Sequence, residues 1–326
     1  MKSHESHNSI LGEWDPYIPF YIAALVLTII VISIDQFTHP LHPDVAFHVS
    51  AARLILEKGS LHEYYFDANP PIFAYMLTIP VLLNSFLGIS VVFWVKSFVF
   101  MIAGLSCISI KKELAKWSSI TLSQSIALAC LFLPPMLFGH DFEFGQRDHY
   151  CAILFIPYVV YVAVTWADTS SEKRKISLTP YLCLAVGLAI KPYFIIIWIV
   201  GEGLLAFKAD QFRSIINSGN FLIIIFGILY LTFIAIFDPY YYSDVLPVAI
   251  SAFGEMGSEH SLTTYLLSYA ICALAFGVNF FVKIDREIKA FVFVFCVSAV
   301  AAMCAYFIQS GYSYQTIPAD TLLLYS

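Results

Sequence analysis

The stretch YIPFYIAALVLTIIVISI (residues 17–34) contains no charged residue and decides the class of fold. As an α-helix it would be about 27 Å long, close to the ~30 Å of hydrocarbon in a bilayer. A second stretch, NFLIIIFGILYLTFIAIF (220–237), has the same character. Neither stretch alternates polar and apolar residues, as a strand of a transmembrane barrel would. The sequence therefore predicts an all-α fold, a polytopic transmembrane helical bundle.

The composition of the whole chain agrees with this class. Of the 326 residues, 60 % are hydrophobic and 12 % are charged, and the mean hydropathy is +0.78. A soluble domain would carry about 25 % charged residues. The segment before the first apolar run lacks the charge pattern and cleavage site of a signal peptide, so this run is predicted to be a retained span. We expect residues 1–326 to form a single membrane-embedded domain.

Most of the 17 Lys and Arg residues fall into four clusters: KKELAK (111–116), EKRK (172–175), KADQFR (208–213) and KIDREIK (283–289). Positively charged loops of membrane proteins are retained on the cytoplasmic side. All four clusters are therefore predicted to be cytoplasmic. The same topology gives a cytoplasmic N-terminus.

Residues 71–110 contain two apolar runs. If both crossed the membrane, the KKELAK cluster would lie outside, so just one of the two runs is predicted to cross. Pro80 and Gly88 favour a broken helix that lies along the outer face over residues 71–88. The true span would then be 90–110. Residues 36–89 are predicted to form an outer loop with short interfacial helices, one of them at about 44–58.

The run from 181 to 210 raises the same question, because a single crossing would put Lys208 outside. Two half-helices that turn at Lys191-Pro192 would return the chain to the cytoplasm, and proline is a natural break point. A lysine at such a tip needs water or an anion.

The complete prediction has spans near 17–35, 90–110, 120–139, 151–167, 219–237, 261–282 and 290–309, with the hairpin at 181–210. A further helix is expected to begin at about 318, and the sequence is expected to be truncated within it. The polar segments between these elements converge on the outer side. A candidate site is therefore predicted at the outer surface.

The sequence gives little support to other kinds of site. The cysteines form no CxxC pair and are predicted to be small core residues. His39, His42, His48 and His62 fit no zinc pattern, so no metal ligands are assigned. There is no P-loop and no GxGxxG motif. No nucleic-acid partner is expected.

Several motifs occur in an order that resembles the GT-C membrane glycosyltransferases, especially the protein O-mannosyltransferase and aminoarabinose-transferase type. An acidic residue follows the first span, DANPP (67–71) opens an interfacial helix, and Lys96 lies near the outer end of the second span. GLAIKP (187–192) forms the hairpin tip. FGQRDHY (144–150) and GYSYQTIPA (311–319) are similar to outward-facing motifs of uncharacterised bacterial members.

The resemblance implies transfer of a sugar from a polyprenyl-phosphate donor to an acceptor on the periplasmic side of a bacterial inner membrane. The acceptor would be a cell-envelope glycan, a lipid or a protein, and the identities of the sugar and the acceptor stay open. Such chemistry needs a carboxylate base and cationic groups at the lipid phosphate. Some members also use a divalent metal, so no cofactor is assigned with certainty.

Two acids are the candidate catalytic residues. The family places its acid in the first outer loop near the start of a short helix, which implies that Asp44 is the base. The alternative is that Asp44 caps this helix. Asp67 would orient the acceptor or hold a metal, or would close an Asx turn before Pro70. Asn69 is expected to shape the site beside it.

Four side chains are candidates for binding the donor phosphate: Lys191, Arg147, Lys96 and His149. Each has a structural alternative: a pair with an outer-loop acid for Lys191, a salt bridge within the loop for Arg147, snorkelling to headgroups for Lys96, and simple solvation for His149. Tyr314 would stack on the sugar or belong to the interfacial aromatic belt.

A lipid flippase or transporter without transferase activity is the alternative function. It would also use a half-helix hairpin. It should show an inverted repeat and polar residues at the membrane midplane, and the apolar spans show neither.

Overall fold

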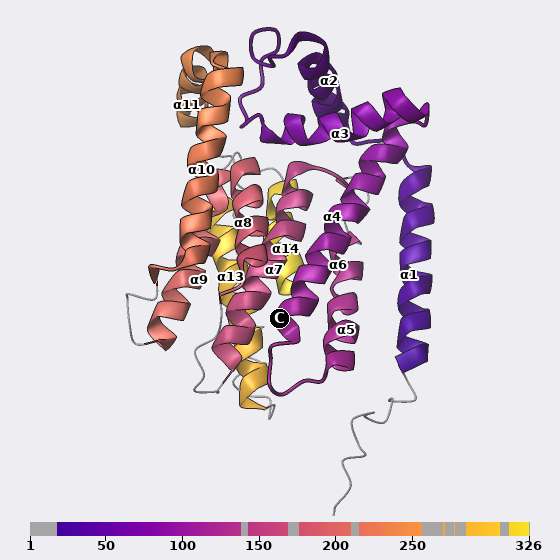
Figure 1. Cartoon of the computed structure of the whole chain (residues 1–326), viewed down its shortest axis with the longest axis vertical. Coiled ribbons are helices and arrows are strands. Elements are labelled where there is room, and N and C mark those ends of the chain that lie inside the picture. The colour runs from indigo at the N-terminus through magenta and orange to yellow at the C-terminus, as the bar shows by residue number, and fades with distance from the viewer. Residues whose placement is uncertain are drawn as a thin grey trace, which may run out of the picture.

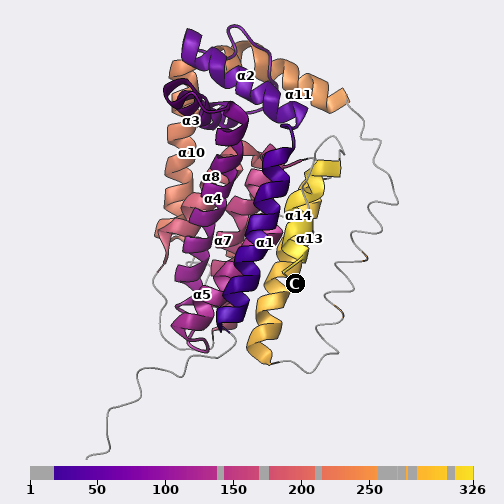
Figure 2. The same cartoon turned by 90° about the vertical axis from the view of Figure 1, so that its right-hand side faces the viewer.

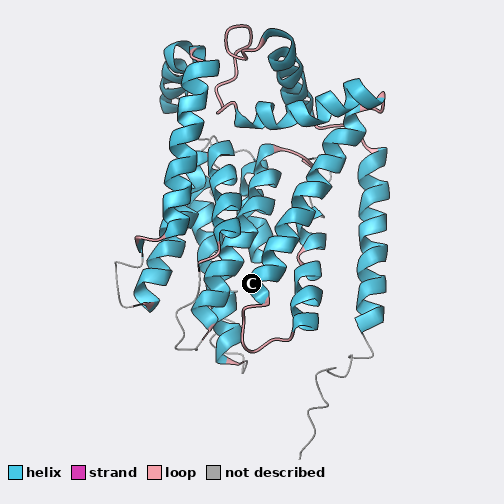
Figure 3. Ribbon diagram, in the orientation of Figure 1, coloured by secondary structure: helices cyan, strands magenta, loops and turns pink. Residues whose placement is uncertain are grey.

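The structure is a computed structural model that describes residues 18–137, 143–168, 176–209, 215–255, 285–306 and 313–325, together with positions 270 and 277. The predicted span at 261–282 lies outside the described residues apart from those two positions. Over the described ranges the fold is helical and contains no strand (Figure 3). The all-α prediction is confirmed.

Four helices are long and apolar enough to cross a membrane: α4 (Val91–Leu114), α7 (Arg147–Ala167), α10 (Ser218–Phe237) and α13 (Arg286–Tyr306). A fifth is obtained if α1 (Ile18–Thr38) is counted together with α2 (Pro43–Lys58), which is bent from it by 72°. The predicted span at 120–139 is divided into α5 (Leu122–Leu131) and α6 (Leu133–Leu137), because two prolines follow Leu133.

Three helices cover one end of this bundle. Figures 1 and 2 show α2, α3 (Ile72–Leu87) and α11 (Leu246–Glu255) across the ends of the upright helices. α3 ends at Gly88, whose left-handed φ of 68° closes the helix with a hydrogen bond to the carbonyl of Asn84. Residues 72–87 therefore form a helix separate from α4, as expected, and the position of this helix along the outer face of a membrane stays a prediction.

The predicted hairpin is also present. α8 (Leu178–Ile190) and α9 (Ile195–Lys208) are joined at Lys191 by a short 3₁₀ turn (Pro192–Phe194). Tyr181 early in α8 donates a hydrogen bond to Glu202 late in α9, at 2.7 Å, so the two helices run in opposite directions. The tip lies at the start of α7, where Lys191 meets Asp148.

α7 forms the centre of the bundle, and 89 % of the residues in its apolar stretch are buried. Helices α8 and α9 approach α7 closely because each of them has a glycine where it contacts an aromatic ring of α7. A Cβ atom on Gly187 would lie 2.5 Å from the ring of Phe155, and one on Gly201 would lie 2.5 Å from the hydroxyl of Tyr158. These glycines allow the α8–α9 hairpin to pack directly against α7.

Beside α7 lies a polar cluster that the sequence did not reveal. The Glu202 carboxylate is buried and accepts hydrogen bonds from Tyr158, Tyr181, Asn217 and Asn220. The expectation of almost uniformly apolar spans is wrong here. Because four donors satisfy the carboxylate, the cluster is a structural link between α7, α8, α9 and α10.

Candidate functional site

The candidate site lies at the end of the bundle that is covered by α2 and α3. The loop between these two helices (59–71), the start of α7 and the hairpin tip meet there, and they contribute Asp67, Arg147 and Lys191. Three predicted site residues from distant parts of the sequence are thus brought to one end of the molecule (Figure 1).

Asp67 is buried, and its carboxylate is oriented by its neighbours. The backbone N–H and the side-chain amide of Asn69 both donate to Oδ1, at 3.0 and 2.6 Å. The other oxygen lies 3.3 Å from Nδ1 of His48 on α2. The predicted Asx turn is therefore present, and Asn69 contacts the acid as expected. The same carboxylate is also aimed at the centre of the site.

The cationic side of the site comes from α7 and the hairpin tip. Nζ of Lys191 lies 2.8 Å from the Asp148 carboxylate, and both side chains are buried. The predicted pairing of Lys191 with an acid is therefore present. The Nη1 atom of Arg147 is buried and has no hydrogen-bond partner among the described residues. A guanidinium nitrogen without a partner is available to donate to an anion, and a guanidinium group can bind an anion through two parallel hydrogen bonds.

Burial, followed by the charge of Arg147, lowers the pKa of His48 to about 4, although Asp67 opposes this shift. The imidazole is therefore neutral at pH 7. A neutral ring can hold a hydrogen bond without adding positive charge to the site.

This shift predicts how stability depends on pH. The unfolded chain binds a proton to His48 below about pH 6.5, and the folded chain resists this until about pH 4. The contribution of His48 to the free energy of unfolding should be fully present above pH 6.5. The free energy of unfolding should decline by up to about 3 kcal/mol as the pH falls to 4. Melting temperatures measured between pH 7 and 4 would check this. In His48→Gln the decline should be smaller by this amount, and an unchanged pH profile would contradict the assignment.

Asp44 lies in the first turn of α2 and is partly exposed. It is not the cap of the helix, as the alternative interpretation held. His42 is the N-cap, and its Nδ1 accepts the Asp44 N–H at 3.1 Å. The Asp44 carboxylate is therefore not required to begin α2.

Glu143, shortly before the start of α7, is an additional acid. Burial, together with the charges of Asp148 and Asp44, raises the pKa of its carboxyl group. Asp44 and Glu143 are thus close enough to influence one another. Two neighbouring carboxylates are a common arrangement for moving a proton.

The other three candidates have different surroundings. Lys96 is buried in α4, and its ammonium group donates to the carbonyls of Gln36 and His39 at the end of α1. His149 is buried; Nδ1 accepts the Gly145 N–H, and Nε2 lies 2.6 Å from the carbonyl of Met136. Both residues hold structural contacts beside the site. Tyr314 belongs to a 3₁₀ turn (Ser313–Thr316), and its side chain lies outside the described residues.

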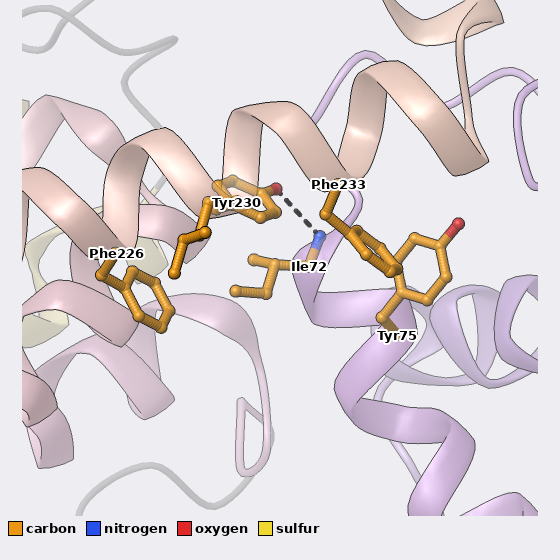
Figure 4. Close-up of a pocket in the computed structure, with 6 residues that line it drawn as sticks. Ile72, Tyr75, Phe226, Tyr230 and Phe233 are labelled. Atoms are coloured by element: carbon orange, nitrogen blue, oxygen red, sulfur yellow. Dashed lines mark hydrogen bonds between the residues drawn. The ribbon is translucent and has the colours of Figure 1, made fainter.

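An apolar groove of about 380 Å³ lies between α3 and α10, close to the polar site. It is open on one side and is lined by Ile72, Tyr75, Phe226, Leu229, Tyr230 and Phe233 (Figure 4). The hydroxyl of Tyr230 accepts the backbone N–H of Ile72 at 3.2 Å. This contact fixes the start of α3 to α10 only a few residues beyond Asp67.

No group of three or more potential metal ligands occurs among the described residues. Comparison with known proteins gives no match to a family model, to a curated protein or to a solved structure. The chemistry of the site is therefore argued from its own residues.

Proposed function

We propose that this chain is a membrane glycosyltransferase that transfers a sugar from a polyprenyl-phosphate donor to an acceptor outside the cytoplasm. The observation that carries the proposal is the meeting of Arg147, Lys191 and several carboxylates beside an apolar groove. A lipid-linked phosphate sugar needs all three features: cations at its phosphate, a carboxylate at its sugar and an apolar surface for its chain.

In the proposed reaction, an acceptor hydroxyl attacks the anomeric carbon and passes its proton to the carboxylate of Asp44. The bond between this carbon and the phosphate oxygen breaks, and polyprenyl phosphate leaves. Arg147 would bind the phosphate with its buried, unpaired Nη1, and Lys191 would add positive charge from the hairpin tip. Asp67 would orient the acceptor.

The distribution of basic residues supports a site on the non-cytoplasmic side. Lys208 donates to carbonyls at the far end of α7, at Thr165 and Trp166. Trp117, just after the KKELAK cluster, donates to Glu287 at the start of α13. The described residues of these clusters lie at the end of the bundle opposite the site, which the positive-inside rule would place in the cytoplasm. We infer a bacterial inner membrane from the family resemblance alone.

The test is a transfer assay with the full chain in lipid vesicles, radiolabelled polyprenyl-phosphate sugars as donors, and cell-envelope extracts as acceptors. The parent should transfer label from at least one donor. Arg147→Gln should lower kcat/KM by about 100-fold or more, since one lost charge-stabilising donor typically has this effect.

The matched control is Arg53→Gln, because Arg53 is an exposed arginine on α2. It should transfer sugar at the parental rate. Failure of the parent to transfer label from any donor would contradict the proposal and would favour the flippase alternative. Equal loss in both arginine variants would show that Arg147 has no special role.

A further inference from the structure

The loop that carries Asp67 is attached to the end of α10 by a buried pair of residues that takes no part in the proposed reaction. His62 and Asp238 have fully buried side chains, and Nδ1 of His62 lies 2.7 Å from Oδ2 of Asp238. The other carboxylate oxygen of Asp238 accepts the backbone N–H of His62 and the hydroxyl of Ser60, each at 3.0 Å. Three hydrogen bonds therefore join segments that are about 180 residues apart in the sequence.

The second ring nitrogen of His62 connects this pair to the site. Nε2 lies 3.1 Å from the backbone carbonyl oxygen of Asp67. Both ring nitrogens thus face oxygen atoms that can only accept, a carboxylate on one side and a carbonyl on the other. A neutral imidazole has one donor nitrogen, so both contacts are hydrogen bonds only when the ring is an imidazolium ion.

The surroundings of the pair fit a buried ion pair. The ring of Tyr241 lies 5.1 Å from the ring of His62, within the range of a cation–π contact. Burial would raise the pKa of Asp238, but the hydrogen bonds from His62 and Ser60 outweigh burial and hold this pKa below its ordinary value. Tyr75 on α3 is a further titratable group close enough to Asp238 to interact with it.

We propose that His62 is a positioning residue for Asp67, held as an imidazolium ion by its counter-ion Asp238. The contact with the Asp67 carbonyl fixes the backbone of the loop, and so determines the direction in which the Asp67 carboxylate points towards His48. This inference deepens the proposed function and rests on it for the catalytic consequence only. The protonation state of His62 and the orientation of the Asp67 carboxylate can both be measured without any sugar transfer.

The first test is nuclear magnetic resonance of the full chain with ¹⁵N-labelled histidine, in which His62→Gln identifies the signals of His62. At pH 7 both ring nitrogens of His62 should show the shifts of a protonated imidazolium. The signature of a neutral ring, with one protonated and one bare nitrogen, would overturn the inference. His39→Gln is the matched control, since the side chain of His39 is exposed.

The second test uses ¹³C-labelled aspartate, with Asp67→Asn to identify the carboxyl signal of Asp67. This signal should move in His62→Gln, because both donors of a glutamine side chain are on one nitrogen atom and cannot take the places of the two ring nitrogens that face Asp238 and the Asp67 carbonyl. It should stay in place in His39→Gln. An unmoved signal in a folded His62→Gln variant would show that His62 does not position Asp67.

Transfer kinetics give the catalytic readout. His62→Gln should lower kcat by about 10- to 100-fold with the donor KM unchanged, since a displacement of about 1 Å costs this much. Asp238→Asn keeps the shape of its side chain and should show a smaller loss of the same kind. If the parent transfers no sugar, the proposed function fails, but the two resonance measurements still decide the positioning role. If the parent and His62→Gln have equal kcat, the positioning role fails and the function stands.

Discussion

Replacement of Asp44 by Asn is expected to lower the rate of sugar transfer by about 10²–10⁴-fold, the contribution of a general base. Asparagine keeps the size of the side chain and removes its ability to accept a proton at neutral pH. Helix α2 should be unaffected, because His42 caps it in place of Asp44. The measurement is kcat in the vesicle assay together with the circular dichroism spectrum of each variant.

Glu57→Gln is the matched control for this prediction. Glu57 is an exposed carboxylate on the last turn of α2, so its loss changes the net charge of the helix equally. Its transfer rate should equal that of the parent. If Asp44→Asn retained the parental rate, the base would have to be sought among Glu143 and Asp67, two acids of the site that are not paired with Lys191.

Replacement of Lys191 by Met is expected to lower stability and transfer together. It leaves the Asp148 carboxylate buried, with 1 % of its side chain exposed and without its 2.8 Å partner. Removing one member of a buried ion pair typically costs about 3–5 kcal/mol. Thermal unfolding in detergent should show a clear drop in melting temperature relative to the parent.

A double variant separates the two roles of Lys191. In Lys191→Met with Asp148→Asn, no unpaired charge is left buried, so most of the lost stability should return. Transfer should stay low, because the positive charge at the hairpin tip is still missing. A double variant that regained both stability and transfer would reduce Lys191 to a structural residue. One that regained neither would show that the pair is essential to the packing of the tip.

Much of the fold could be predicted because membrane topology depends on features of the sequence itself. The length of the apolar runs and the positions of the basic clusters were enough to predict that the run at 71–88 is separate from the span after it and that the chain turns at Lys191-Pro192. Both elements are present. Single helices in a membrane satisfy their own backbone hydrogen bonds, so their existence follows from local sequence.

The site was only partly predictable. Asp67, Arg147 and Lys191 were chosen as candidates because each belongs to a short motif, next to an apolar run, that resembles a motif of the GT-C glycosyltransferases. His48, His62, Asp238 and Glu143 were not, because nothing in the local sequence distinguishes them from solvated loop residues. Lys96 and His149 were correctly noticed as polar residues near apolar segments, but their partners are backbone carbonyls and an N–H that no local pattern identifies.

The sequence by itself therefore determined the class of this protein, an α-helical bundle whose helices can span a membrane. Only the tertiary structure decided which polar groups meet. The pairs His62–Asp238 and His48–Asp67, and the four donors around Glu202, join segments from distant parts of the chain. The physical reason is that a buried polar group must find its partner in space, whereas an apolar helix needs only its own length and the surrounding lipid.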